Sequence, residues 1–67
     1  MEDNWSVVYT HNVLYHVEIL KAVLEDNGIE SVIINRVDSN YLFGDIELYV
    51  SNEDFDNAKK IIASVEF

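Results

Sequence analysis

Residues 12–27 have the spacing of an amphipathic helix, and the short β-branched segments on either side of them limit the folds open to this chain. Apolar side chains recur at steps of three and four, which places them on one helical face: Val13, Val17, Leu20 and Leu24, widened by Ile19 and Val23. Thr10 or Asn12 can cap the start of this helix, and Gly28 stands where a helix commonly ends in a left-handed residue.

Three segments are predicted to be strands. Residues 5–10 and 29–35 are rich in β-branched and aromatic side chains, and residues 45–50 alternate, with Ile46, Leu48 and Val50 on one face. Residues 36–44 are predicted to be a loop. For the first strand the pattern leaves two alternatives open, because either Trp5, Val7 and Tyr9 or Ser6, Val8 and Thr10 can face the core.

A second helix is predicted after the third strand. Ser51 can accept hydrogen bonds from the first-turn amides, Asp54 can bond back, and apolar residues then recur at helical spacing: Phe55, Ala58, Ile62 and Val65. A helical crossover makes the first two strands parallel, and the next two form an antiparallel hairpin.

The resulting β-α-β-β-α order predicts an α+β fold, with residues 1–67 as a single domain. We expect a ferredoxin-like two-layer sandwich, with a three-stranded mixed sheet, the third strand between the other two, and both helices on one face. The final strand of that fold is missing, so the first strand is expected to have a free edge.

The charge of the chain limits the kinds of partner that it can bind. Four Lys and Arg against 13 Asp and Glu give a net charge of −9 at pH 7, which repels the phosphates of nucleic acid. The chain has no Cys, no apolar run near the roughly 20 residues of a membrane span, and an acidic start unlike a secretory signal. We therefore expect a soluble, cytoplasmic domain that binds neither nucleic acid nor membrane.

No catalytic, metal or cofactor residues are predicted. His11 and His16 are five residues apart, which on a helix separates them by about 140°, so they would not form a metal-binding pair. No Ser stands in a nucleophile elbow, and neither Gly belongs to a phosphate-binding loop. An enzyme is therefore the least favoured of the functions considered.

The remaining candidates are binding surfaces. One is an aromatic and apolar interaction surface on the open sheet face and the loop, made of Trp5, Tyr9, Tyr41, Leu42, Phe43 and Tyr49. The loop residues alternatively close the end of the core, and Leu14 and Tyr15, off the buried helical face, could extend the surface. The other is a set of anion contacts, made of Arg36, Lys59 and Lys60.

These surfaces predict a non-enzymatic regulatory or protein-interaction domain with a protein partner or a second copy of itself. The alternative is a sensor of a small anionic ligand, in which the basic residues meet the ligand near the aromatic ones.

The chain also resembles a small family of prokaryotic domains described as putative signal-transducing proteins. The resemblance rests on Val8-Tyr9-Thr10, Ala22-Val23-Leu24-Glu25, Gly28-Ile29, the run from Gly44 to Val50, and Asp54 with Ala58. It covers nearly the whole chain and implies a ferredoxin-like domain with a shape related to the PII regulators. No catalytic residue is carried over, and the ligand-binding loop and basic nucleotide contacts of PII proteins have no counterpart in this sequence.

Overall fold

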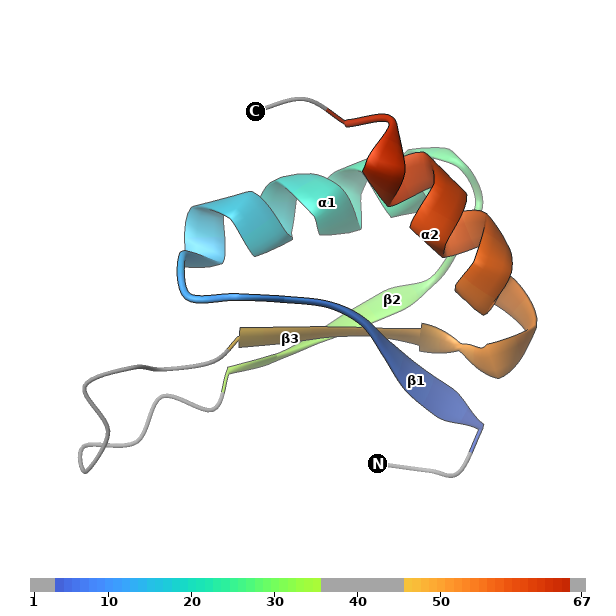
Figure 1. Cartoon of the computed structure of the whole chain (residues 1–67), viewed down its shortest axis with the longest axis horizontal. Coiled ribbons are helices and arrows are strands. Elements are labelled where there is room, and N and C mark those ends of the chain that lie inside the picture. The colour runs from blue at the N-terminus through green and yellow to red at the C-terminus, as the bar shows by residue number, and fades with distance from the viewer. Residues whose placement is uncertain (1–3, 36–45, 66–67) are drawn as a thin grey trace.

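A computed structural model describes residues 4–35 and 46–65 of the chain (Figure 1). Its elements follow in the order β1 (Trp5–His11), α1 (Leu14–Asp26), β2 (Ser31–Asn35), β3 (Ile46–Ser51), the short 3-10 helix η1 (Asn52–Asp54) and α2 (Phe55–Ala63). This is the β-α-β-β-α order predicted from the sequence. The fold is α+β, with one sheet and two α-helices in the described residues.

The sheet has three strands in the order β1-β3-β2, and β3 pairs antiparallel with both neighbours. The central place of the third strand is confirmed, but the prediction of a mixed sheet is wrong. The first two strands do run in the same direction, yet they are not neighbours, because β3 lies between them and runs against both. Every hydrogen-bonded pair in the sheet is therefore antiparallel.

The pairing of β1 with β3 is interrupted at Val8. Val7 is paired with Tyr49 and Tyr9 with Leu48, so two steps along β1 correspond to one step along β3. Such a β-bulge shifts the alternation of side chains by one residue. Neither predicted alternative for β1 is therefore right, because the face that points toward the core changes partway along the strand.

Both helices lie on the same side of the sheet (Figure 1). The core lies between the two layers and consists of Val8, Val17, Leu20, Leu24, Ile29, Ile46, Leu48, Val50 and Ala58, with Phe55, Ile61, Ile62 and Val65 packed against it. The predicted buried faces of the two helices are thus confirmed except at Val13. That side chain is 42% exposed, because Val13 precedes the first residue of α1.

Local signals define the ends of the helices. Gly28 has a φ of 78°, as expected after a helix, and Ser51 accepts a hydrogen bond from the amide of Glu53 at 3.3 Å. The start of α1 differs from the prediction, since neither Thr10 nor Asn12 caps it. Instead, the backbone amide of Val13 donates to Nδ1 of His11 at 3.0 Å. Neither described helix is long and apolar enough to cross a membrane.

Candidate interaction surface

The side of the sheet that faces away from the helices carries mostly apolar side chains. In β3, Ile46, Leu48 and Val50 point toward the helices, so the alternate residues point away. Directly paired residues lie on the same face, and the register therefore defines this surface, which we call the open sheet face: Trp5, Val7, Thr10, Val32, Ile34, Glu47, Tyr49 and Ser51. In the part of the chain that the structure describes, no helix covers it (Figure 1).

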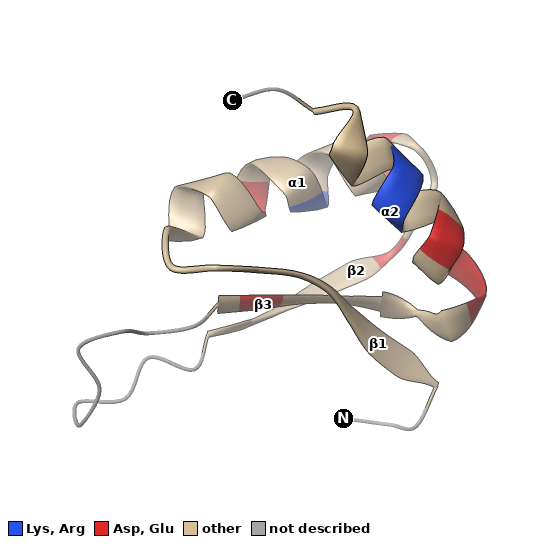
Figure 2. Cartoon of the chain, in the orientation of Figure 1, with Lys and Arg blue, Asp and Glu red and all other residues tan. Residues whose placement is uncertain are grey.

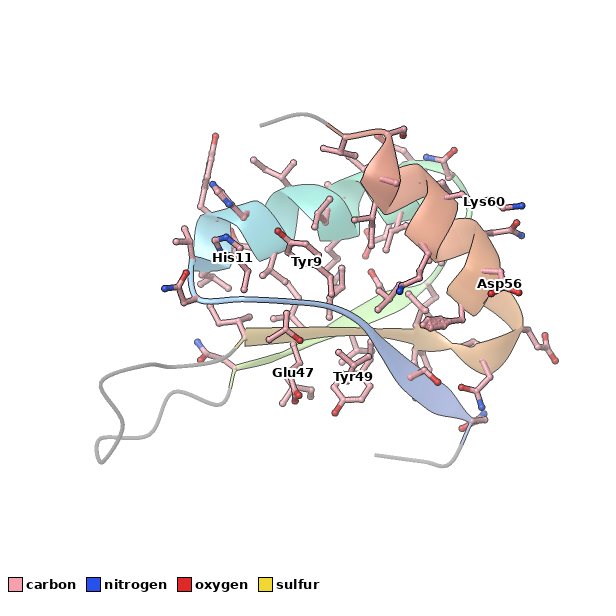
Figure 3. The ribbon with its side chains drawn as sticks, viewed as in Figure 1. Tyr9, His11, Glu47, Tyr49, Asp56 and Lys60 are labelled. Atoms are coloured by element: carbon pink, nitrogen blue, oxygen red, sulfur yellow. The ribbon has the colours of Figure 1, made fainter. Side chains whose placement is uncertain are left out.

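Tyr49 lies at the centre of the open sheet face. It is paired with Val7 of β1 on one side and with Val32 of β2 on the other. Its side chain points away from the helix layer (Figure 3), yet only 9% of the residue is exposed. The phenol donates a hydrogen bond to Oε1 of Glu47 at 3.3 Å. The ring is therefore held in place before any partner arrives.

Tyr9 does not belong to this surface, although the sequence grouped it with Trp5 and Tyr49. Because of the bulge at Val8, Tyr9 is paired with Leu48 and lies on the helix side of the sheet (Figure 3). Its ring stacks on that of His11, with centroids 5.9 Å apart and the planes 3° from parallel. The structure thus separates the three strand aromatics into two on the open sheet face and one beneath the helices.

The two histidines lie closer together than predicted. His11 is the last residue of β1 and not part of α1, so the helical angle used above does not apply to it. The two ring centroids are 4.6 Å apart. Nδ1 of His11 already accepts the amide of Val13, which assigns the ring proton of its neutral form to Nε2. Among the described residues, no group of three or more His, Asp or Glu could hold a metal ion.

Most charged residues that the structure describes lie outside the strands, chiefly on the helices, while β3 carries one (Figure 2). Lys21 pairs with Glu25 within α1, and Lys59 lies over the ring of Phe55, 5.4 Å from its centroid, within α2. Glu47 is the one Asp, Glu, Lys or Arg in the three described strands.

Two of the three predicted anion contacts can be placed. Lys59 and Lys60 both belong to α2, on the opposite side of the sheet from Tyr49 (Figures 1 and 3). Arg36 lies outside the described residues, as do Tyr41, Leu42 and Phe43. In the part that is described, the lysines are therefore not brought near the aromatic residues of the open sheet face.

Some surface residues were not predicted. Val32 and Ile34 belong to the open sheet face, and the alternation of β2 could have indicated them, whereas Val7 was one of two alternatives that the sequence left open. A separate exposed group lies at the start of α1, where Val13, Leu14 and Tyr15 are 42%, 40% and 67% exposed. Leu14 and Tyr15 lie off the buried face of α1, as predicted. Because they belong to the helix layer, they do not extend the open sheet face.

Comparison with known proteins gives one match. The model of the family DUF2007, described as “Putative prokaryotic signal transducing protein”, matches residues 5–66. No curated protein and no solved structure matches the chain significantly. The matched residues include every strand and helix described above.

Proposed function

The chain belongs to the family DUF2007, and from that premise we propose that it is a small regulatory domain that binds another protein through its open sheet face. It acts by association and not by catalysis. The description of the family supports a regulatory role, and the binding surface is inferred from the geometry of the sheet.

The observation that carries this proposal is the apolar character of the open sheet face. Of its eight residues, Trp5, Val7, Val32, Ile34 and Tyr49 are apolar or aromatic, while the described helices cover only the opposite side. Covering apolar surface gains roughly 25 cal/mol per Å² removed from water. A partner that lays an apolar face across the sheet therefore gains free energy without requiring any change in the fold.

Charge defines the chemistry of that partner. The chain has a net charge of −9, so an acidic partner or a nucleic acid is repelled, and a partner with a neutral or basic rim is favoured. Among the described residues, Glu47 is the one charged residue of the three strands, so the centre of the open sheet face is apolar. Electrostatic attraction between the domain and its partner therefore acts at the margin of their interface. We propose that the domain binds this partner in the cytoplasm, in keeping with a regulatory role.

We also propose that the five main elements form a ferredoxin-like domain that lacks the last strand of that fold. The central place of β3 and the position of both helices on one face support this assignment. A shape related to the PII regulators would follow from it.

A photo-crosslinking experiment tests the binding surface. A photoreactive amino acid is placed at Thr10, an exposed residue of the open sheet face, and in a matched variant at Lys60, an exposed residue of α2. In cells that make the protein, we expect a discrete protein adduct from the Thr10 variant and none from the Lys60 variant. Adducts from Lys60 alone, or equal adducts from both positions, would contradict the proposal.

A thermal-shift screen distinguishes this function from the sensor of an anionic ligand. A ligand at 100 times its dissociation constant adds about 2.7 kcal/mol to the free energy of unfolding. We expect no such shift with nucleotides or other anionic metabolites. A selective shift that disappears in a Lys59→Ala, Lys60→Ala double variant would favour the sensor instead.

A further inference from the structure

Asn27 and Gly28 form a dipeptide that is chemically prone to rearrange. The backbone nitrogen of the residue after an asparagine can attack the side-chain amide, and a following Gly hinders this attack least, because it has no Cβ. Asn27 is the one asparagine of the sequence that a Gly follows. Both residues are exposed at the end of α1, so water reaches them in the folded domain. The sequence thus supplies the groups for self-deamidation, and the structure decides when they can react.

The reaction needs no enzyme and no co-reactant besides water. The nitrogen of Gly28 forms a bond to Cγ of Asn27, the bond from Cγ to Nδ2 breaks, and Nδ2 leaves as ammonia with the proton that the Gly28 nitrogen loses. Water then adds to one carbonyl of the cyclic imide, and the bond from that carbon to the nitrogen breaks. Attack at Cγ gives aspartate, whereas attack at the main-chain carbonyl gives isoaspartate, whose backbone runs through the former side chain.

The structure holds both reacting groups in hydrogen bonds. The nitrogen of Gly28 donates to the carbonyl of Glu25 at 3.0 Å, so the proton that must leave is shared with an acceptor. Nδ2 of Asn27 donates to the carbonyl of Val23 at 2.8 Å, which holds the side chain against the preceding turn of α1. At the observed ψ of 11°, the tetrahedral geometry of Cα also turns Cβ of Asn27 away from the Gly28 nitrogen, so the ring cannot close without a large rotation of ψ.

The bond from Gly28 belongs to a Schellman motif that ends α1. The second bond of this motif runs from the amide of Ile29 to the carbonyl of Leu24 at 2.9 Å. Leu24 and Ile29 are 0% and 6% exposed, and both belong to the core. Opening the motif therefore draws Ile29 out of the core, which closes this helix end more firmly than a terminus that frays freely.

We propose that Asn27-Gly28 is a self-modification site, which the Schellman motif keeps closed in the folded domain and which opens when the last turn of α1 unfolds. This inference goes beyond the proposed function and does not depend on it. Deamidation marks a chain that has opened, because a neutral amide becomes a carboxylate and the net charge of −9 becomes −10.

The product favours further opening. Its new carboxylate lies next to Asp26 at the end of α1, where the helix dipole is negative and the last turn has no basic residue. The bond from Nδ2 to the carbonyl of Val23 is lost as well, because a carboxylate has no proton to donate. A modified chain therefore reopens more readily than the natural one.

Tandem mass spectrometry of proteolytic peptides tests the closed state. The natural chain is incubated in warm, mildly alkaline buffer, folded in one sample and unfolded by guanidinium chloride in the other. We expect Asn27 to deamidate at least about tenfold more slowly in the folded sample, because the rate follows the fraction of open chains. Asn57, exposed in α2 and followed by Ala58, is the control within the same chain and should react far more slowly than Asn27 when unfolded. Equal rates at Asn27 in the two samples would overturn the proposal.

Two matched core substitutions distinguish opening of the helix end from unfolding of the whole domain. Ile29→Val loosens the Schellman motif, whereas Ile46→Val makes the same change at a residue that is paired with His11, near the start of α1. The two isoleucines are similarly buried, with 6% and 3% exposed. We expect folded Ile29→Val to deamidate several-fold faster than the natural chain, and Ile46→Val at nearly the natural rate. Equal acceleration of both variants, or of neither, in samples whose fold is confirmed by circular dichroism, would contradict the role of the motif.

The effect of the modification is measured with Asn27→Asp and its matched control Asn57→Asp. Both variants gain one negative charge, but Asn57 lies in the first turn of α2, where the helix dipole is positive. We expect a lower melting temperature for Asn27→Asp than for the natural chain, and an equal or higher one for Asn57→Asp. An Asn27→Asp variant as stable as the natural chain would overturn the inference that the product favours opening.

Discussion

Nδ1 of His11 accepts the backbone amide of Val13 at 3.0 Å, so a side chain from the last residue of β1 serves the start of α1. The residue at the N-cap position, Val13, makes no side-chain cap of its own. The first amides of a helix have no partner within the helix, and an acceptor supplied from outside stabilises it. The end of the strand and the beginning of the helix are thereby fixed together.

Replacing this acceptor should weaken the fold. We expect His11→Ala to lower the free energy of unfolding by about 1 kcal/mol, as the loss of a helix cap typically does. The matched variant His11→Asn keeps a side-chain acceptor at the same position and should lose less. Urea unfolding followed by circular dichroism measures both. If the two variants are equally destabilised, the stacking of His11 on Tyr9 matters more than the hydrogen bond.

The bulge in β1 gives two neighbouring valines different surroundings. Val8 is 7% exposed and belongs to the core, whereas Val7 is half-buried on the open sheet face. Thr has nearly the shape of Val but adds a hydroxyl group, which is costly to bury without a partner. We expect Val8→Thr to cost about 1–3 kcal/mol of stability and Val7→Thr less than about 1 kcal/mol. The reverse ranking in thermal unfolding would place the bulge elsewhere.

Two serines should respond to the same substitution with opposite signs. Oγ of Ser31 is buried with no hydrogen-bond partner among the described residues, whereas Oγ of Ser51 accepts the amide of Glu53. Ser31→Ala should raise the free energy of unfolding by about 1 kcal/mol, because it removes an unsatisfied polar group. Ser51→Ala should lower it by a similar amount, because it removes a cap.

For a domain of this size, 1 kcal/mol corresponds to roughly 4–8 °C in the melting temperature, which calorimetry resolves readily. A fall in stability on Ser31→Ala would show that its hydroxyl has a partner after all.

Gly28 should tolerate no ordinary side chain without cost. Its φ of 78° lies in the left-handed region, while a Cβ built on it would meet no atom within 4 Å. The penalty of Gly28→Ala is therefore conformational and not steric, and we expect about 1 kcal/mol of lost stability. Gly28→Asn should cost less, because Asn adopts this conformation more readily. An Ala variant as stable as the natural chain in urea would contradict this account.

Much of the fold could be predicted because its signals are local. The spacing of Val17, Leu20 and Leu24 fixes the buried face of α1, and the alternation of Ile46, Leu48 and Val50 fixes that of β3. The ends of the helices at Gly28 and Ser51 follow from the same short-range chemistry. The place of β3 between the other strands followed from the helical crossover and the hairpin. The prediction of a mixed sheet was nevertheless wrong, because a central β3 is antiparallel to both of its neighbours.

The open sheet face could be predicted only in part, because its membership depends on a distant strand. Val7 and Val8 are the same residue type, and nothing near them indicates which one points into the core. The choice is made by the pairing of β1 with Tyr49 and Leu48, some 40 residues further along the chain. The position of Tyr9 follows from that choice. Likewise, the role of His11 as an acceptor depends on β1 extending one residue beyond the predicted strand of residues 5–10.

The central position of β3 has a consequence for how the chain folds during synthesis. The first two strands of the sheet share no hydrogen bond with each other, and the strand that joins them is the last of the three to be made. Trp5, for example, is paired with Ser51. A nascent chain that ends before Ile46 can form the helix α1, because helical contacts are local, but it has no sheet on which that helix can pack. The domain therefore folds as one cooperative unit, and only after nearly its whole length has left the ribosome.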